Sequence, residues 1–140
     1  MKKSFYIIIA VLFAGAGAIG AYYYINRSVS GISGKKADFS LTPQHLLADF
    51  TADEQSANVR YLDKVIVTEG KINSIKSDEK NNVNIVLDTG DPMSSISCVL
   101  DKEEAKKSEK LRPNDPVKIK GVCTGMLMDV IMVNCVIEDK

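Results

Sequence analysis

The sequence has no tryptophan and one histidine, and all of its tyrosines and phenylalanines precede residue 62. The C-terminal half therefore has no aromatic ring on which a nucleobase could stack, as single-strand nucleic-acid binders require. His45 has no cysteine or carboxylate cluster at ligand spacing around it. We expect it to be an ordinary exposed helix residue rather than a metal ligand.

An excess of charge of one sign is also missing, because 18 basic and 18 acidic residues cancel. Three of the basic residues, Lys2, Lys3 and Arg27, flank the N-terminal segment, so residues 28–140 carry a net charge of about −3. Affinity for nucleic-acid backbones depends on neutralising phosphates with lysine and arginine. This balance argues against nucleic acid as the main ligand.

Signatures of catalysis and of cofactor binding are absent from the sequence as well. The three cysteines have no CxxC spacing and no accompanying histidine, so we expect no zinc site. No nucleophile stands beside a recognisable base, and no glycine-rich phosphate loop is present. The sequence therefore predicts a protein that is not an enzyme and that holds no metal or cofactor.

One long uncharged segment is present at the N-terminus. Phe5 to Ile25 contains 21 residues without a charge, enough for a helix of about 30 Å. Basic residues precede it, and three tyrosines at its far end suit a membrane-water interface. We predict that residues 1–27 form a signal anchor that crosses the cell membrane once, with the remainder of the chain outside the cytoplasm, in the periplasm.

A cleavable signal peptide is the alternative for this segment. Ala14-Gly15-Ala16 and Ala16-Gly17-Ala18 both resemble signal-peptidase sites, and cleavage there would release a secreted protein. We favour the anchor because the apolar segment continues past both sites. Residues 28–39, rich in serine and glycine, are expected to be a flexible linker.

Residues 40–63 are predicted to form a helical segment that precedes the β domain. Thr42-Pro43 is a typical helix start, and Thr51 to Glu54 repeats a capping pattern. The segment is therefore either two short helices or one helix with a break near Thr51.

Residues 64–140 show the alternating apolar pattern of a mainly β domain. The predicted strands are Lys64 to Lys76, Val83 to Leu87, Ile96 to Leu100, Val117 to Cys123 and Val130 to Ile137, and a helix from Asp101 to Leu111 follows the third. Three strands, a helix and two strands are the order of a five-stranded Greek-key OB-fold barrel. Gly70 marks the place where the long first strand, strongly bent, would need a bulge or a coil.

A family resemblance supports this fold. The stretch Tyr61 to Lys64 followed by Val67-Thr68-Glu69-Gly70-Lys71-Ile72, and the ending Ile119 to Gly125 followed by Asn134-Cys135-Val136, resemble the OB-fold family called tRNA_anti-like. The resemblance covers about residues 40 to 138 and implies the OB fold. It implies no reaction. Asn114 stands where the family commonly has glycine, but asparagine also tolerates positive φ.

Strand phase points all three cysteines inward, and Cys135 shares its phase with Ile131, Val133 and Ile137. Small core residues are the plain interpretation, but an oxidising compartment would allow a disulfide. We expect a bridge between Cys123 and Cys135 if the hairpin turn centres on Asp129, with Cys98 to Cys135 as the alternative. A tight turn at Leu127 would instead place Cys123 opposite Ile131.

Two groups of side chains are candidate contact surfaces. Met126, Leu127 and Met128 form either a plug over the barrel end, which we favour, or a surface for a partner. A weak basic face is expected from the lysines of the first and fourth strands, namely Lys71, Lys76, Lys118 and Lys120. Asp88, Asp91 and Asp129 are interpreted as turn residues, and Asp129 could also fix the register of the hairpin.

The function predicted from these features is that of a non-catalytic, membrane-tethered OB-fold module. Its expected ligand is a partner protein, a peptide or an envelope glycan. The alternative is binding of single-stranded nucleic acid on the barrel face, which the fold invites and the composition disfavours.

Overall fold

The structure is a computed structural model that describes residues 2–25 and 31–139, in two separate units. The first unit contains one helix, α1 (Lys2–Ile25). Its window Tyr6–Tyr23 has a mean hydropathy of 1.8, so the helix is long and apolar enough to cross a membrane. A signal sequence would pass the same test. The segment predicted to be an anchor or a signal peptide is therefore one apolar helix. Arg27, the basic residue that follows it, lies outside the described residues.

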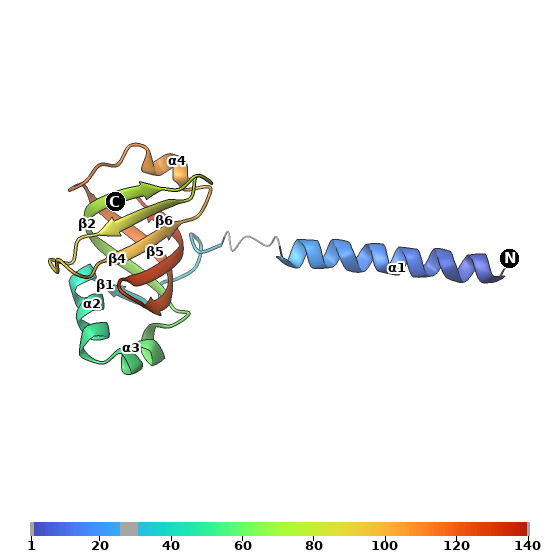
Figure 1. Ribbon diagram of the computed structural model, residues 1–140, viewed down its shortest axis with the longest axis horizontal. Helices are drawn as coiled ribbons and strands as arrows, with labels where there is room; N and C mark the ends of the chain where they lie inside the picture. The colour runs from blue at the N-terminus through green and yellow to red at the C-terminus, as the bar shows by residue number, and fades with distance from the viewer. Residues whose placement is uncertain (1, 26–30, 140) are drawn as a thin grey trace. The chain divides into compact units, whose positions relative to one another are not determined.

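The second unit is a closed barrel built from the strands that the sequence predicts (Figure 1). The barrel strands are β2 (Val65–Ser77), β3 (Val83–Leu87), β4 (Ile96–Leu100), β5 (Pro116–Met126) and β6 (Val130–Glu138). The sheet order is β1-β2-β3-β4-β6-β5, and pairing of β2 with β5 closes it. β4 and β6 run parallel, while the other barrel pairs are antiparallel. This is the topology of an OB fold.

The long strand β2 belongs to both halves of the barrel. Val65 to Lys71 pairs with β5, and Ile72 to Ser77 pairs with β3, with a register shift between Ile72 and Ser74. The predicted bulge at Gly70 is therefore wrong, since Gly70 pairs regularly with Val117. Gly70 is needed for space instead, because a Cβ there would lie 2.6 Å from Pro43 Cγ.

Two short helices close one end of the barrel. They are α2 (Pro43–Ala52), capped by the Thr42 hydroxyl, and α3 (Glu54–Tyr61), capped by the Asp53 carboxylate. Of the two possibilities for the lead-in, the structure has two helices. Leu46, Leu47, Phe50, Ala57 and Tyr61 point from them into the barrel core.

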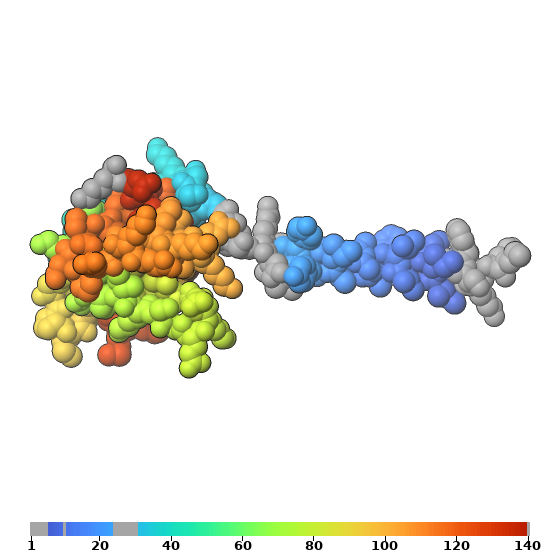
Figure 2. Space-filling view, turned by 90° about the horizontal axis from the view of Figure 1, so that it is seen from above, coloured from blue at the N-terminus to red at the C-terminus, as the bar shows by residue number. Residues whose placement is uncertain are grey.

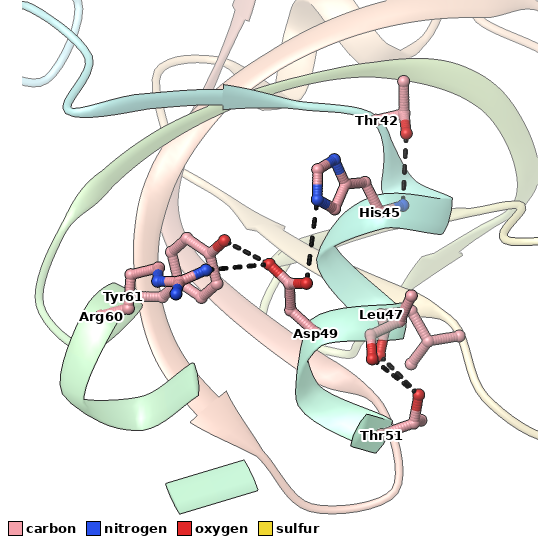
Figure 3. Close-up of polar contacts among 8 residues, drawn as sticks. Thr42, His45, Leu47, Asp49, Thr51, Arg60 and Tyr61 are labelled. Atoms are coloured by element: carbon pink, nitrogen blue, oxygen red, sulfur yellow. Dashed lines mark hydrogen bonds and ion pairs between the residues drawn. The ribbon is translucent and has the colours of Figure 1, made fainter. Parts of the chain in front are cut away.

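A polar cluster joins α2 to α3 (Figure 3). The Tyr61 hydroxyl donates to Asp49 at 2.5 Å, and the Arg60 guanidinium lies 3.6 Å from the same carboxylate. Burial, followed by the hydrogen bond to Asp49, raises the pKa of Tyr61. His45 is exposed, as predicted, and its Nε2 lies 3.8 Å from Asp49. This cluster fixes the angle between the helices.

The region predicted as a flexible linker is largely part of the barrel unit. We call residues 31–38 the strap. Ile32 in it is 1% exposed, and Asp38 accepts a hydrogen bond from the amide of Val65 at 2.9 Å. The next residues form β1 (Phe39–Leu41), which pairs in parallel with β2. The linker prediction was wrong for residues 31–39, because one apolar side chain and one carboxylate dock there; residues 28–30 lie outside the described chain.

Strand β6 departs from simple alternation. Val130, Met132 and Cys135 are buried, whereas Ile131, Val133 and Ile137 are only partly buried. The sequence assigned Ile131, Val133, Cys135 and Ile137 to one inward face, which is wrong for the first two. Asn134 has a φ of 51° at a bulge, and the extra residue reverses the phase of the strand before Cys135.

Candidate ligand-binding groove

An open groove of about 700 Å³ lies where the end of the β2–β3 hairpin faces the segment around α4 (Ala105–Ser108). Figure 2 shows the two segments, green and orange, side by side on one face of the barrel unit. The predicted helix was longer, Asp101 to Leu111, but only one turn of it is α-helical. The remainder forms turns that leave the groove open.

The floor of the groove is apolar and its rim is basic. Three half-buried side chains, Ile75, Val83 and Leu111, form the apolar part. Lys80, Lys102 and Lys106 line the rim together with one carboxylate, Glu109. Within the described residues, no ion pair neutralises Lys102 or Lys106.

A second hollow of about 370 Å³ continues the groove toward the outer face of β3 and β4. Ser77 and Val83 line both hollows. The second one adds Lys76, the carboxylate of Asp78, and the side chains of Asn82, Asn84 and Val99. A chain-like ligand could therefore extend from α4 across the hairpin onto the β3–β4 face, which is the face that OB folds use for oligonucleotides and oligosaccharides.

The hairpin end is held rigidly by Asp78. Its carboxylate accepts hydrogen bonds from the Lys80 amide at 2.9 Å, the Asn82 amide at 2.9 Å and the Asn82 side chain at 2.8 Å. These bonds, led by the Asn82 side chain, lower the pKa of Asp78. The loop therefore presents Lys80 from a fixed backbone.

The opposite wall is attached to the barrel through Glu104. One of its carboxylate oxygens accepts from the Ile137 amide at 3.0 Å, and the other lies 3.0 Å from Lys107 Nζ. The bond to Ile137 ties the α4 segment to β6. Both walls of the groove are therefore anchored to β-strands.

The basic face predicted from Lys71, Lys76, Lys118 and Lys120 does not form. Lys118 and Lys120 both pair with Glu138, at 3.3 Å and 2.6 Å, and Lys120 is 7% exposed. Only Lys76 lines a hollow of the candidate groove. The prediction was wrong because it took strand lysines to be free, whereas Glu138 lies beside two of them.

The residues Met126 to Met128, at the tip of the β5–β6 hairpin, differ in their burial. Met126 packs against the core, but Leu127 and Met128 are 85% and 76% exposed. The plug interpretation is therefore wrong for these two residues. Asp129 is a turn residue, as predicted, and it also joins two loops, because its Oδ1 accepts from the Ser95 amide at 2.7 Å.

All three cysteines are free and buried. Cys123 lies opposite Met132, because the hairpin turns at residues 127–129, so the register that a Cys123–Cys135 bridge requires is absent. Cys98 and Cys135 lie on the adjacent strands β4 and β6. Among the described residues, no group of three or more histidine, cysteine or acidic side chains could hold a metal ion.

Sequence reasoning missed the lysines of the groove, Lys80, Lys102 and Lys106. Residues 101–110 alternate acidic and basic charges, so their composition gave no basic signal. Position could have identified Lys80, because the loop between the first two barrel strands flanks the binding face of an OB fold. No such signal marks Lys102 and Lys106.

The fold and the groove together define an OB-fold protein with a preformed, lysine-rimmed groove. The tRNA_anti-like family model matches residues 1–137, so the chain belongs to the tRNA_anti-like family. This confirms the resemblance and the fold predicted from the sequence. No curated protein matches the chain.

Among solved structures, the chain is similar to a "putative nucleic acid-binding lipoprotein" from Klebsiella pneumoniae. The identity is 16%, the match covers 71% of this chain and 92% of that one, and the TM-score is 0.57. The Schizosaccharomyces pombe Stn1-Ten1 complex matches at 17% identity over 54% of this chain and 59% of that one, with a TM-score of 0.43. Asparaginyl-tRNA synthetase from Entamoeba histolytica matches at 16% identity over 56% and 21%, with a TM-score of 0.43. At these identities the first likeness shows the fold alone.

Proposed function

We propose that the protein is a non-catalytic OB-fold binding module, held at the cell membrane by α1 with the barrel outside the cytoplasm, and that it binds its ligand in the groove between the β2–β3 hairpin and α4. The observation that carries this proposal is the groove of about 700 Å³ with an apolar floor and a lysine rim. Concave sites with an apolar lining and a few placed polar groups are the usual form of a ligand site.

The ligand class that this groove favours is an acidic peptide segment of a partner protein. Lys80, Lys102 and Lys106 offer three cations to carboxylates, and Ile75, Val83 and Leu111 offer contact to apolar side chains between them. The groove residues include no aromatic side chain, so stacking of sugars or bases has no platform. An extended peptide can bind without an aromatic side chain or a metal ion in the groove.

Single-stranded nucleic acid is the second candidate, and a specific observation supports it. Lys76 in the adjoining hollow extends the line of lysines onto the β3–β4 face. The Klebsiella pneumoniae protein described as a "putative nucleic acid-binding lipoprotein" has the same fold. Binding of this kind would depend mainly on phosphates and would weaken steeply with salt.

The test is a fluorescence anisotropy titration of the full chain in detergent micelles. The probes are a labelled peptide that alternates glutamate and leucine, a labelled oligothymidylate and a labelled neutral oligosaccharide. We expect the peptide to bind and the double variant K102E/K106E to weaken it about tenfold, as loss of two charge contacts would do. The control K64E/K71E changes two exposed lysines outside the groove and should alter binding less than about twofold.

The outcomes separate the candidates. Oligothymidylate binding that exceeds peptide binding and falls steeply between low and physiological salt would favour the second candidate. Binding of the oligosaccharide alone would assign a glycan ligand. Absence of binding to all three probes, or equal effects of the two double variants, would reject the groove as the binding site.

A further inference from the structure

Two cysteines meet inside the barrel where β4 and β6 run side by side. Cys98 and Cys135 are both 0% exposed, and the Cys98 thiol is close enough to contribute, after burial, to the raised pKa of Cys135. The parallel register pairs Cys98 with Met132 and Leu100 with Cys135, so the two cysteines are diagonal neighbours. Cys123, on β5, lies opposite Met132 in the hairpin register and not opposite Cys135.

The bulge in β6 is what brings Cys135 to Cys98. From the first register pair to the second, β6 advances by three residues, from Met132 to Cys135, whereas β4 advances by two, from Cys98 to Leu100. Without the extra residue, strict alternation after Met132 would turn Cys135 away from the core. Asn134 adopts a φ of 51° to allow the bulge, a conformation that only a few residue types tolerate.

Space for the Cys135 sulfur is provided by the neighbouring strand. A Cβ on Gly121 would lie 2.5 Å from Cys135 Sγ, so a glycine is required opposite it. The bulge and the glycine therefore place the Cys135 sulfur beside Cys98.

We infer that Cys98 and Cys135 form a disulfide when the chain folds under oxidising conditions. The two thiols lose two protons and two electrons as the S–S bond forms, and a disulfide-bearing oxidant, which is reduced to two thiols, accepts the electrons. Such oxidants are typical of extracytoplasmic compartments, so formation of the bridge in the cell also depends on the proposed location.

The oxidation has to precede closure of the barrel. The attacking species in thiol–disulfide exchange is the thiolate, and neither sulfur is accessible in the folded unit. Burial, and then the neighbouring Cys98 thiol, hold the pKa of Cys135 well above its usual range. The folded, reduced protein should therefore resist oxidation for as long as it stays folded.

The experiment is to unfold the full chain, reduce it, and refold it in detergent with a buffer of reduced and oxidised glutathione. Free thiols are then blocked with N-ethylmaleimide in denaturant and counted by mass spectrometry. We expect one label, on Cys123, and three labels if a reductant is added before blocking. The bridged form should unfold at a midpoint roughly 10 °C above the reduced form, because the bridge closes a long loop.

Single cysteine variants identify the partners. C123A should keep the bridge and take no label without reductant, whereas C98A and C135A should each take two labels. Three labels on the refolded wild type would overturn the inference, and so would a bridge that survives in C98A. The same count on protein trapped in its native membrane tests the location separately. A bridge that forms only in the refolding buffer would leave the inference standing and reject an oxidising compartment.

Discussion

At the scale of single residues, Thr68 is the one whose chemistry disagrees with its surroundings. It lies on β2, is 0% exposed, and among the described residues its hydroxyl is the buried side-chain group without a hydrogen-bond partner. An unpaired hydroxyl in an apolar core costs about 1–3 kcal/mol of stability. Valine has almost the same shape as threonine but carries no hydroxyl.

Replacement of Thr68 by valine should therefore stabilise the barrel. We expect T68V to raise the free energy of unfolding by about 1 kcal/mol, measured by urea denaturation of the full chain in detergent. T124V is the comparison, because the Thr124 hydroxyl is exposed and donates to the Ile131 carbonyl at 3.1 Å. The free energy of unfolding of T124V should equal that of wild type or be lower by no more than about 0.5 kcal/mol. A loss of stability in T68V would mean that the hydroxyl has a partner, such as a buried water.

Asparagine and aspartate replace glycine at several positions of positive φ in this chain. Asp63, Asn81, Asn114 and Asn134 have φ between 51° and 72°. The sequence prediction for Asn114 is confirmed. Asn134 was not recognised, because it lies inside an apolar strand where alternation predicts a regular backbone. One unrecognised bulge residue was enough to misplace Ile131 and Val133.

At the scale of elements, the strap is held to the barrel partly by one buried lysine. Lys120 Nζ donates to the carbonyls of Ser33 at 3.2 Å and Lys35 at 3.1 Å, and it also pairs with Glu138 at 2.6 Å. One buried ammonium thus satisfies two strap carbonyls and one carboxylate. The strap has no regular secondary structure before β1.

Loss of this ammonium should release the strap. We expect K120M to lower the free energy of unfolding by about 2 kcal/mol, because Glu138 and two carbonyls lose a largely buried partner. Limited trypsin digestion should then cut faster after Lys35 and Lys36. K118M is a matched control, since Lys118 pairs with the same Glu138 at 3.3 Å but its side chain is 37% exposed. It should cost about 0.5 kcal/mol and leave the cleavage rate unchanged. Equal effects of the two variants would show that the strap does not depend on Lys120.

The same ion pair predicts a dependence on pH. The hydrogen bond from Lys120 is the main cause that lowers the pKa of Glu138 below its ordinary value of 4.5. Because the folded-state pKa is the lower one, the stabilisation is complete above about pH 4.5 and is lost as the pH falls through the lowered pKa. The difference in unfolding free energy between wild type and E138Q should therefore shrink between pH 5 and pH 3. A difference that stays constant across this range would contradict the pairing.

The fold could be predicted from the sequence far better than the site. Alternating valine and isoleucine define each barrel strand to within a few residues, because burial of one face is a local signal. The groove is not local. Lys80 and Lys106 lie in separate segments that only barrel closure brings to one rim. Lys118 and Lys120 pair with Glu138 on β6, the other strand of the same hairpin, and this pairing depends on a register that the bulge in β6 shifts. The register of a bulged hairpin has no clear signature in a single sequence.

At the scale of the whole molecule, function depends on whether α1 stays attached to the barrel unit. Helix α1 (Lys2–Ile25) carries no charge after Lys3, and its segment Tyr6–Tyr23 is long and apolar enough to span a hydrocarbon core. A retained helix confines the groove to the neighbourhood of the membrane, which raises the effective concentration of any membrane-bound partner. A cleaved helix would release a diffusing binding module.

Expression of the full chain with a C-terminal tag in a Gram-negative host decides between these forms. We expect the protein to stay in the membrane fraction after an alkaline carbonate wash and to keep an intact N-terminus by mass spectrometry, because no charge interrupts residues 5 to 25. Protease added to spheroplasts should remove the barrel unit, whereas protease added to intact cells should not.

The control variant A16L/A18L removes small residues from both candidate cleavage sites and should behave like wild type. A soluble wild-type product that begins after residue 16 or 18, together with a membrane-bound A16L/A18L, would instead identify α1 as a signal peptide. Protection of the barrel in spheroplasts would place it in the cytoplasm, where neither the proposed display outside the cell membrane nor a lasting disulfide is expected.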